Sequence, residues 1–461
     1  MAPSRSEPYD VLVVGAGPAG LAAAAAAVAA GDRVAVVDAG DRPGGQYWRQ
    51  PGTVAAPDQA LQHDLATYRR LVATARAADW FAGHAVWTLT RTAPGFAVHA
   101  VTRSARTETR ATLFACRLVL APGAYDRQLP FPGWDLPGVM TAGGVQALLT
   151  GHGVLAGRRV LVAGTGPFLL TVAAGLVRAG AQVVGVHEAS PGTGWLRSPG
   201  AVARNAAKLT EGLGYAATLA RHRVPVHRRS AVLAAHGDQA VTSATVGRLD
   251  RDGRVRRPSE HTVDVDLLAV GWGFTPQLEL PLALGCATRV DLDGSLVCTV
   301  DDDQRSSVDG VWVAGEACGV GGAALAVAEG EIAGAAAAGA AAPTRARRRR
   351  AAGRAFAAAM HQAHPVPAGW TDRVTDDTVV CRCEEVTAGA LRAAVDELGA
   401  DTARSAKLVV RTGMGWCQGR VCGYATSCLV AEQTGRRPSP PLPERPIAVP
   451  LTLGALAESA D

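Results

Sequence analysis

Apolar positions near the start of the chain follow the order strand, turn, helix and strand. Residues 9–14 form a continuous run of mostly strand-forming residues, rich in valine, which is typical of a strand buried on both faces of a parallel sheet. A glycine-rich turn at 15–20, an alanine-rich helical stretch that ends at Gly31 and a second apolar run at 34–38 complete the pattern. This order predicts a βαβ unit, and therefore a parallel α/β sheet.

The same pattern returns further along the chain. Residues 159–163 form another strand pattern, a glycine turn follows at 164–166, and a helix pattern leads to an apolar run at 182–186. Beyond it, residues 222–268 alternate apolar and polar positions between Gly-Asp and Asp-Gly turns, which predicts antiparallel strands. The predicted fold class is thus α/β, with two dinucleotide-binding units in one chain.

Later segments predict how the chain continues. A short buried run at 311–313 precedes a helix of small residues, and we interpret it as the return of the chain to the first unit. A connector rich in arginine follows, then a compact cysteine-rich region, then a tail with too many prolines for a central strand or a helix. The predicted division is a discontinuous first domain at 1–155 and 262–342, an inserted second domain at 156–261, a linker at 343–370, a cysteine-rich domain at 371–435 and a tail at 436–461.

Length and composition narrow the class of protein. At 461 residues, 48% hydrophobic and 19% charged, the chain is too long for a single small binding module and too apolar for global disorder. Its 46 basic and 41 acidic residues leave a net charge of +5, which is too small to bring the whole molecule onto nucleic acid or anionic lipid. We interpret the basic run Arg345–Arg350 as a solvated helix face or linker, and His361 and His364 as surface residues. The alternative is a nucleic-acid-binding protein whose cysteines hold zinc.

No targeting or membrane-spanning segment is expected. Residues 1–10 carry proline, serine and charges where a secretion signal needs an apolar core, so we expect a cytoplasmic protein. The apolar stretches Leu21–Ala30 and Ile332–Ala342 are too short to span a bilayer and are built of alanine, which favours buried helices. Peripheral association with a membrane is left open.

The first glycine-rich turn has the spacing of a dinucleotide-binding loop. Gly15 permits a tight turn, Gly17 lets the backbone approach a pyrophosphate, and Gly20 lets the helix pack closely on the strand. The N-terminus of the helix then offers free N–H groups and a positive dipole to an anion. Asp38, at the end of the second strand, is placed to accept hydrogen bonds from an adenosine ribose. The alternative is a tight strand-to-helix turn without a ligand. Further backbone donors are expected from Gly44, Gly45 and Gln46.

The second glycine turn is less regular. Gly164 and Gly166 match the first two glycines, but Leu169 stands at the third position, so its helix is not expected to pack as closely on its strand. Glu188 follows the next strand as the acid that binds a ribose, and without an arginine beside it in the sequence it favours NAD over NADP. The alternative is a structural repeat that no longer binds a nucleotide.

Nine cysteines, an odd number, are concentrated toward the C-terminus, which indicates metal or cluster ligation rather than disulfides. Residues 379–383 predict an extended segment in which Cys381 and Cys383 face the same side, and a glycine-rich loop carries Cys417 and Cys422. Four thiolates suit a [2Fe–2S] cluster, with structural zinc and two disulfides as alternatives. We interpret the remaining cysteines as buried small apolar residues: Cys116, Cys286, Cys298, Cys318 and Cys428.

These features together resemble a known family. Over nearly its whole length the chain resembles the FAD-dependent subunits of bacterial heteromeric amine and amino-acid dehydrogenases. They include the A subunit of opine oxidase, the B subunit of hydrogen cyanide synthase and the α subunit of hydroxyproline or proline dehydrogenases. The matching stretches are 14–20, 43–46, 121–124, 129–144, 271–276, 313–322, 381–384 and 413–422, and the last two together are highly specific.

The resemblance implies cofactors and further residues. In such proteins a glutathione-reductase-like first unit holds FAD, the inserted unit holds NAD(P) or another adenine nucleotide, and a domain like bacterioferritin-associated ferredoxin holds [2Fe–2S]. It also implies that Gly123, Gly315 and Glu316 contact the flavin, although family members usually carry Asp at the position of Glu316. The implied cluster ligands are Cys381, Cys383, Cys417 and Cys422.

The resemblance also implies an electron-transfer role. No cysteine pair stands beside the first unit and no Cys-x-x-Cys lies in the second, so disulfide exchange is not expected. Since a second nucleotide unit fills the space of a large substrate domain, we expect a partner to oxidise an opine, hydroxyproline or glycine-type substrate. That partner is an FAD-containing oxidase or dehydrogenase subunit, and a small ferredoxin-like subunit is a further expected partner. Electrons then pass through the cluster and this chain's FAD to NAD or another acceptor, and no side chain is needed as acid or base. The alternative is a stand-alone NAD(P)H-dependent reductase that feeds a soluble carrier.

Overall fold

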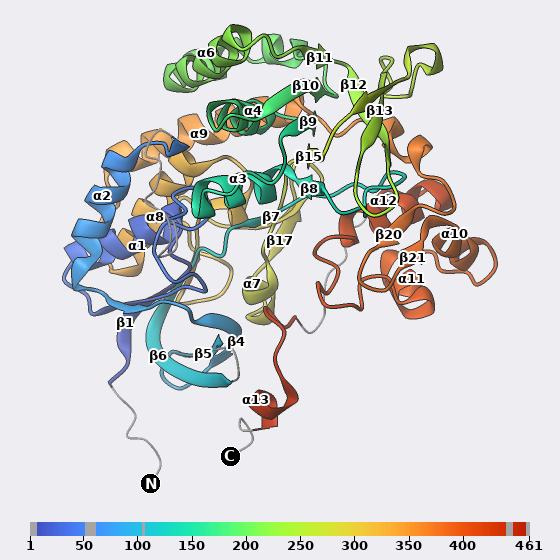
Figure 1. Cartoon of the computed structure of the whole chain (residues 1–461). Helices are drawn as coiled ribbons and strands as arrows, with labels where there is room; N and C mark the ends of the chain where they lie inside the picture. The colour runs from blue at the N-terminus through green and yellow to red at the C-terminus, as the bar shows by residue number, and fades with distance from the viewer. Residues whose placement is uncertain (1–6, 51–60, 104–106, 439–445, 458–461) are drawn as a thin grey trace.

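The computed structural model describes residues 7–50, 61–103, 107–438 and 446–457. The expectations for the first six residues and for the prolines within 439–445 lie outside these residues. Figure 1 shows two α/β units, with the cysteine-rich unit beside the second. The α-helices are α1 (Pro18–Ala29), α2 (Leu65–Thr74), α3 (Ala142–His152), α4 (Phe168–Arg178), α5 (Pro199–Ala203), α6 (Ala206–Arg221), α7 (Glu279–Ala283), α8 (Ala323–Ala337), α9 (Thr344–Ala363), α10 (Ala388–Asp396), α11 (Ala403–Val410), α12 (Gly423–Thr434) and α13 (Leu453–Ala457).

The first unit is built on a seven-stranded sheet in the order β3-β2-β1-β6-β5-β4, with β19 also paired to β6. Its strands are β1 (Tyr9–Val14), β2 (Val34–Val37), β3 (Asp79–Phe81), β4 (Ala85–Arg91), β5 (Phe96–Arg103), β6 (Glu108–Leu120) and β19 (Val311–Val313). The first part of β6 pairs antiparallel with β5, and its last part pairs in parallel with β1 and β19. The pairing of β19 confirms the predicted return of the chain to the first unit.

Two alanine-rich helices, α1 and α8, pack side by side against one face of this sheet (Figure 1). A Cβ on Gly330 would lie 2.0 Å from the carbonyl oxygen of Ala19, and a Cβ on Gly334 would lie 2.1 Å from that of Ala23. Larger side chains would separate the two backbones, which explains why both apolar stretches consist of small residues. Both are buried helices, as predicted, and no helix in the described part of the chain is long and apolar enough to cross a membrane.

The second unit is a five-stranded parallel sheet in the order β11-β10-β9-β15-β8. Its strands are β8 (Val139–Thr141), β9 (Arg159–Gly164), β10 (Gln182–Glu188), β11 (Val226–Arg228) and β15 (Leu267–Gly271). Strands β8 and β15 lie outside the predicted limits of the inserted domain, at 156 and 261. The division at those positions therefore stays a prediction, and strand pairing alone places the limits of the second unit further out in the chain.

Smaller sheets extend and connect these units. Strands β12 (Ser230–His236), β13 (Ser243–Arg248) and β14 (His261–Asp264) form an antiparallel sheet, which confirms the alternating pattern predicted for that region. Strands β7 (Ala124–Asp126) and β16 (Phe274–Pro276) pair where the chain passes between the two units. Strands β17 (Thr288–Val290) and β18 (Leu296–Cys298) form a hairpin.

The connector to the cysteine-rich unit is mostly helix α9, which confirms the expected helical middle of the linker. The cysteine-rich unit consists of β20 (Val379–Cys381), β21 (Val386–Thr387) and helices α10 to α12. Trp134, before β8, lies in the same apolar cluster as Leu391 of α10 and Leu429 of α12. Its indole N–H donates to the carbonyl of Val379 at 2.6 Å. The cysteine-rich unit is therefore fixed to the second unit by a shared core.

The tail returns to the first unit. The N–H of Ala448 donates to the carbonyl of Trp87 at 3.0 Å, and Thr452 donates to the carboxylate of Glu108. Helix α13 then begins after Pro450, the last proline of the chain. The prediction of a tail without a helix is wrong here, because residues 453–457 carry no proline.

Candidate functional site

The first glycine loop forms a tight cradle between β1 and α1. Gly15 has a φ of +97°, and a Cβ on Gly20 would lie 1.7 Å from the carbonyl oxygen of Gly15. A Cβ on Gly45 would lie 2.7 Å from the Cα of Gly17, so the second glycine segment closes against the first. The structure thus brings these four predicted residues together, and the backbone is accessible because side chains are absent.

The N-terminus of α1 is open toward this cradle. Its N-cap residue, Gly17, has no side chain to accept the first N–H groups, Pro18 begins the helix, and no acidic residue lies in the first turn. The free N–H groups and the positive end of the helix dipole favour a bound anion. The loop therefore fits the pyrophosphate of a dinucleotide.

Asp38 lies at the end of β2 beside this loop. Its carboxylate accepts the N–H of Ala16 at 2.5 Å and that of Gly40 at 2.7 Å. Burial raises the pKa of Asp38, against the opposing effect of these two hydrogen bonds. A carboxylate has about four acceptor positions, so a ribose hydroxyl can still donate to it.

The remaining residues expected near the first nucleotide have internal partners. The N–H of Gly44 donates to the carbonyl of Ala16 at 2.8 Å, so it closes the loop instead of facing a ligand. The side-chain oxygen of Gln46 accepts from Arg49 at 2.9 Å. Gly123 has a φ of +85° and lies three residues after the end of β6. Ala121, the first residue after β6, has its backbone against Gly15.

Glu316 caps the loop that leads into α8. Its two carboxylate oxygens accept the N–H groups of Gly322 at 2.9 Å and Gly321 at 3.1 Å. Burial raises the pKa of Glu316 to about 7, although these hydrogen bonds and the charge of Arg354 oppose the shift. The neighbouring Gly315 lies against the first turn of α1, where its Cβ would be 3.0 Å from that of Ala19. Both residues are thus placed beside the first loop.

Replacement of Glu316 by glutamine is expected to remove the loss of folding stability that the ionised carboxylate of Glu316 causes at high pH. The pKa of Glu316 is higher in the folded chain than its ordinary 4.5, so folding binds a proton, and the stability this gives at low pH is lost as pH rises toward 7. Glu316→Gln removes the charge and keeps one acceptor oxygen, so the N–H of either Gly321 or Gly322 loses its partner at every pH. We expect the stability of this variant to change little between pH 4.5 and pH 8, whereas that of the wild type falls by about 3 kcal/mol over this range. Thermal unfolding of the FAD-loaded chain at the two pH values measures the difference. Glu316→Asp is the control, because it should retain the wild-type pH dependence; an identical pH dependence in Glu316→Gln would contradict the assignment.

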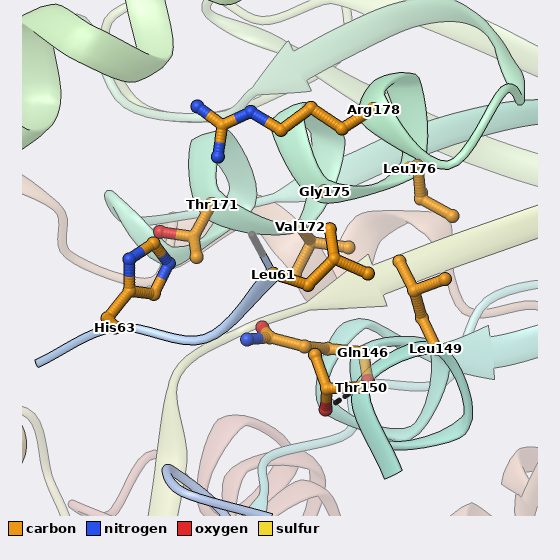
Figure 2. Close-up of a pocket in the computed structure, with 10 residues that line it drawn as sticks. All are labelled: Leu61, His63, Gln146, Leu149, Thr150, Thr171, Val172, Gly175, Leu176 and Arg178. Atoms are coloured by element: carbon orange, nitrogen blue, oxygen red, sulfur yellow. Dashed lines mark hydrogen bonds between the residues drawn. The ribbon is translucent and has the colours of Figure 1, made fainter. Parts of the chain in front are cut away.

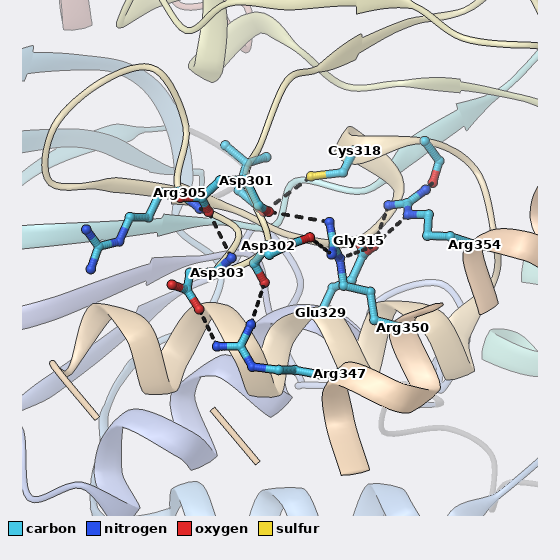
Figure 3. A network of polar contacts seen from close by, with 12 residues as sticks. Asp301, Asp302, Asp303, Arg305, Gly315, Cys318, Glu329, Arg347, Arg350 and Arg354 are labelled. Carbon is cyan, nitrogen blue, oxygen red and sulfur yellow. Dashed lines mark hydrogen bonds and ion pairs between the residues drawn. The ribbon is translucent and has the colours of Figure 1, made fainter. Parts of the chain in front are cut away.

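Glu329 of α8 is a fully buried acid that contacts the 315–322 loop (Figure 3). Its carboxylate lies 2.6 Å from the guanidinium of Arg354 and accepts the N–H of Gly315 at 3.0 Å. Arg354, on α9, also donates to the carbonyl of Gly319 at 2.9 Å. Sequence reasoning missed this pair, because an acid inside an alanine-rich helix has no local signal that points to an arginine in the linker.

The basic run at the start of α9 is an ion-paired helix face. Arg347 lies 2.5 Å from a carboxylate oxygen of Asp303, and Arg350 lies 2.9 Å from one of Asp302 (Figure 3). Such exposed pairs contribute little each. The pairs show that the basic run is one face of α9, which packs on the turn at Asp302 and Asp303 before β19.

The second glycine loop has the same strand-to-helix geometry. Gly164 has a φ of +137°, and its Cβ would lie 1.7 Å from the carbonyl oxygen of Gly271. Gly166 has a φ of +101°, and no atom lies within 4 Å of the position of its Cβ, so a ligand can approach its backbone. Leu169 is buried against Gly271, where it fills the space between α4 and the sheet.

Glu188 ends β10 beside this loop, where its position in sequence predicts. Its carboxylate accepts the hydroxyl of Thr165 at 3.0 Å and the N–H groups of Gly166 and Ser190, each at 2.9 Å. Burial alone would raise the pKa of Glu188, but hydrogen bonding with His364 and Ser190 outweighs it and lowers the pKa.

Two expectations around Glu188 need correction. His364 is not a surface residue: its Nδ1 lies 2.9 Å from the Ser190 hydroxyl and 3.5 Å from the Glu188 carboxylate. His361 is also engaged, since its Nε2 lies 2.8 Å from the carbonyl of Val320. Arg228 is the register partner of Glu188 on β11, so an arginine does stand beside the acid, although not in sequence, and the preference for NAD over NADP loses its basis.

A small pocket lies between α3, α4 and the segment around His63 (Figure 2). Leu149 of α3 and Val172 of α4 face into it, and Arg178 lies at its edge. Its volume of about 20 Å³ holds one water molecule rather than a nucleotide. It is therefore separate from the two glycine loops.

The four predicted ligand cysteines lie around one turn and one loop of the cysteine-rich unit. Cys381 ends strand β20 and is buried, whereas Cys383 lies in the following turn and is exposed. The expected extended segment therefore stops at Cys381, and the turn, not strand alternation, brings the second thiol near. A Cβ on Gly415 would lie 2.2 Å from that of Cys383, so the glycine-rich loop closes directly over the turn.

The thiols interact as a chain of neighbours. Hydrogen bonding from Cys422 lowers the pKa of Cys381 to about 6 and that of Cys417 to about 5, while these two contacts raise the pKa of Cys422. Cys383 interacts with Cys417 in turn. The N–H of Gly413 points at the sulfur of Cys381 from 3.4 Å. Thiolate character and backbone N–H donors suit iron–sulfur ligation.

The arrangement differs from a closed mononuclear metal site. Among the described residues, no group of three or more His, Cys, Asp or Glu side chains has the geometry to hold a single metal ion. All nine cysteines are free in this structure. The chain of thiols fits a centre with two metal ions, each bound by two cysteines.

The other cysteines are mostly buried, as predicted. Burial raises the pKa of Cys286, Cys298 and Cys318, which makes these thiols poor nucleophiles. Cys428 is half-buried. The prediction is wrong for Cys116, which is exposed, because alternate residues of β6 face solvent in this part of the strand.

The chain matches two protein families. Residues 9–342 match the family described as pyridine nucleotide-disulphide oxidoreductase, and residues 379–432 match the BFD-like [2Fe-2S] binding domain. The first match covers both glycine loops, and the second covers all four candidate cluster ligands.

Similar proteins cover the whole chain. The A subunit of opine oxidase from Rhizobium meliloti is 32% identical over 478 residues, which cover 98% of each chain. The hydrogen cyanide synthase subunit HcnB of Pseudomonas aeruginosa is 32% identical over 465 residues, which cover 97% of this chain and 99% of the relative. The solved structure of L-proline dehydrogenase from P. horikoshii has the same fold, with a TM-score of 0.68 and 19% identity over 97% of this chain and 79% of that one.

Proposed function

The chain belongs to the pyridine nucleotide-disulphide oxidoreductase family, and on that basis we propose that it is the electron-transfer subunit of a heteromeric enzyme that oxidises a C–N bond of an amine or amino acid. The family binds FAD and NAD(P), and the C-terminal domain binds a [2Fe-2S] cluster. The full-length relatives named above are themselves subunits, of opine oxidase and of hydrogen cyanide synthase. The identity of the partner and a cytoplasmic location stay predictions.

In this proposal the residues of the first loop bind FAD. Gly15, Gly17 and Gly20 expose backbone to the pyrophosphate, Asp38 accepts ribose hydroxyls, and the 315–322 loop with Glu316 faces the flavin side. The bound flavin supplies hydride and single-electron chemistry. The protein's part is to place and enclose the cofactors, so no acid or base is assigned. The thiols at 381, 383, 417 and 422 bind the cluster.

The observation that carries the proposal is the rigid link between the cluster loop and the flavin unit. Arg420, two residues from Cys422, lies 2.6 Å from Glu279 at the start of α7, and its guanidinium is 5.7 Å from the ring of Tyr125 on β7. Arg127, also buried, lies 2.8 Å from Asp293 and stacks 4.3 Å from the ring of Tyr424 on α12. A cluster held in this way has a fixed distance to the flavin.

The cluster loop also has an exposed side. Cys381 and Cys422 are buried, whereas Cys383 is exposed and Trp416, next to Cys417, is 75% exposed. A partner that delivers electrons can approach on the side of Cys383. Disulfide reduction, the other activity of this family, is not favoured, because Cys286, Cys298 and Cys318 are buried thiols of raised pKa and the exposed Cys116 has no second cysteine next to it in sequence.

Copurification tests this function. We expect the tagged chain, expressed with its native neighbours in the source organism, to purify with a second flavoprotein. The complex should then reduce a dye with an opine, hydroxyproline or glycine-type substrate, whereas the isolated chain should not. Isolation of the chain alone, with full NADH-dependent activity toward a soluble carrier, would instead support the stand-alone reductase.

A further inference from the structure

The end of the linker helix reaches the second nucleotide loop. His364, the C-cap of α9, places its Nδ1 2.9 Å from the hydroxyl of Ser190 and 3.5 Å from the carboxylate of Glu188. Its other ring nitrogen, Nε2, accepts the indole N–H of Trp195 at 2.9 Å. Since an indole nitrogen can only donate, Nε2 carries no proton in this arrangement, and the proton on Nδ1 faces Ser190 and Glu188.

The segment after Glu188 and the end of α9 also pack against each other around this contact. Residues Thr193–Arg197 form the 3₁₀ helix η3, directly after Glu188 and Ser190. A Cβ on Gly194 would lie 2.4 Å from the Cα of Ala363, so η3 and the end of α9 touch through their backbones. The ring of Trp195 also packs 5.2 Å from that of Phe356, on an earlier turn of α9. The imidazole of His364 is thus held in place by packing as well as by hydrogen bonds.

The acids of the two nucleotide loops differ in what covers them. Asp38 in the first loop accepts two backbone N–H groups and is only partly buried. Glu188 in the second loop is 9% exposed, accepts from Thr165, Gly166 and Ser190, and has the Nδ1 of His364 3.5 Å from the oxygen that accepts from Gly166. The acid at this position is the group that binds the adenosine ribose in a dinucleotide site.

We propose that His364 occupies the place of the adenosine ribose in the second unit and is therefore the residue that controls NAD(P) binding there. A ribose hydroxyl and the imidazole cannot both contact the free side of Glu188. A dinucleotide binds only when the end of α9 withdraws, and its affinity is reduced by the cost of that movement. The Cα of Gly166 stays open to a pyrophosphate, since no atom lies within 4 Å of the position of its Cβ, while its N–H donates to Glu188. This inference rests on the family's NAD(P) binding and not on the substrate of the proposed enzyme.

Withdrawal of His364 would also change the contacts that α9 makes with the 315–322 loop, which faces the flavin. The same helix donates from Arg354 to the carbonyl of Gly319, and His361 lies 2.8 Å from the carbonyl of Val320. Beyond His364 the chain leads directly into the cysteine-rich unit. Nucleotide binding at the second loop is thereby coupled through α9 to the loop that faces the flavin and to the cluster.

Calorimetric titration of the full, FAD-loaded chain tests the proposal with two probes. NADH contains the adenosine ribose, whereas reduced nicotinamide mononucleotide does not. We expect His364→Ala to bind NADH about tenfold more tightly than the wild type, the value of one hydrogen bond to a charged group. Affinity for the mononucleotide should be unchanged. Gln362→Ala is the matched control, because Gln362 is an exposed residue of the same helix turn.

A second variant tests whether tighter NADH binding in His364→Ala comes from a general loosening of the fold. Trp195→Phe keeps an aromatic ring against Phe356 but removes the donor that orients His364, and we expect it to tighten NADH binding as well. The proposal is overturned if His364→Ala leaves NADH affinity unchanged or lowers it, or if affinity for the mononucleotide rises equally. Absence of NADH binding by every variant also overturns it. None of these outcomes depends on copurification with a partner, so failure here is distinguishable from failure of the proposed function.

Discussion

Replacement of Cys422 by serine is expected to remove the iron–sulfur cluster from the chain. Cys422 is buried, contacts the thiols of both Cys381 and Cys417, and stands at the N-cap of α12. Without it one of the two metal ions loses one of its two thiolates, and a centre that needs four thiolates is not retained. We expect iron and acid-labile sulfide to fall from about two of each per chain to background, together with the visible absorption that they cause.

Function and stability should fall with the cluster. Substrate-dependent electron transfer through the complex is expected to stop. The absorption bands of the bound flavin should remain, since Cys422 lies in the cysteine-rich unit and not in the nucleotide-binding loop at 15–20. Thermal stability of the cysteine-rich unit should also decrease, because ligand binding to a small unit contributes to its folding. The unit is expected to remain attached, since its core is continuous with that of the second unit.

The matched control is Cys428→Ser. Cys428 lies on the same helix α12, is half-buried, and contacts Tyr424 rather than the four thiols. It should retain iron, sulfide and activity at wild-type levels. Retention of the cluster in Cys422→Ser, or its loss in Cys428→Ser, would contradict the ligand assignment. One zinc ion per chain, with no iron in the wild type, would overturn the electron-transfer proposal itself.

Features of the site that depend on short stretches of chain could be predicted from the sequence. Gly15 and Gly20 are constrained by a turn of six residues, and the structure shows why: a Cβ at Gly20 would overlap the carbonyl of Gly15. The cysteine spacing similarly predicted a glycine-rich loop that carries Cys417 and Cys422, and the N–H of Gly413 in that loop faces a sulfur. In both cases the residues of the loop belong to one short stretch of chain, so spacing alone carries the information. The contact of the second loop with Cys381, 32 residues before Gly413, is long-range.

Features that depend on distant segments could not be predicted in this way. Strand β8 joins the second sheet only through its pairing with β15, more than a hundred residues later, and no local pattern indicates that partner. His364 meets Glu188 across a sequence separation that includes all of the antiparallel sheet. A lone histidine in a polar helix is most often exposed, so the expectation followed from composition, and tertiary packing overrode it.

The ion pair between Glu329 and Arg354 is the clearest missed feature, and its disruption is expected to have the second large effect. Arg354→Met removes the charge but keeps the length of the side chain. Glu329 is completely buried, and burial raises its pKa while the charge of Arg354 holds it down. Removal of Arg354 leaves the buried carboxylate with only the more distant guanidinium of Arg350, at 3.9 Å, and the loss of the close partner costs about 3 kcal/mol.

The loss should be greatest at high pH. Without Arg354 the pKa of Glu329 rises further above its value in the unfolded chain, so the folded state binds the extra proton and stability falls as pH increases. Because Gly315 donates to Glu329 and Gly319 accepts from Arg354, the 315–322 loop should also loosen and release FAD more readily. Thermal unfolding and flavin release at pH 6 and pH 8 measure both effects.

Two further variants separate the buried pair from general effects on α9. Arg347→Met changes an arginine on the same helix that is 42% exposed and pairs with Asp303, which is 40% exposed, and exposed pairs of this kind contribute less than about 1 kcal/mol. The double variant Glu329→Gln with Arg354→Met removes both charges and should recover much of the lost stability, since no buried charge is left without a partner. If the double variant is as unstable as Arg354→Met alone, the destabilisation comes from lost packing of the arginine stem, and α9 holds the flavin loop by shape rather than by charge.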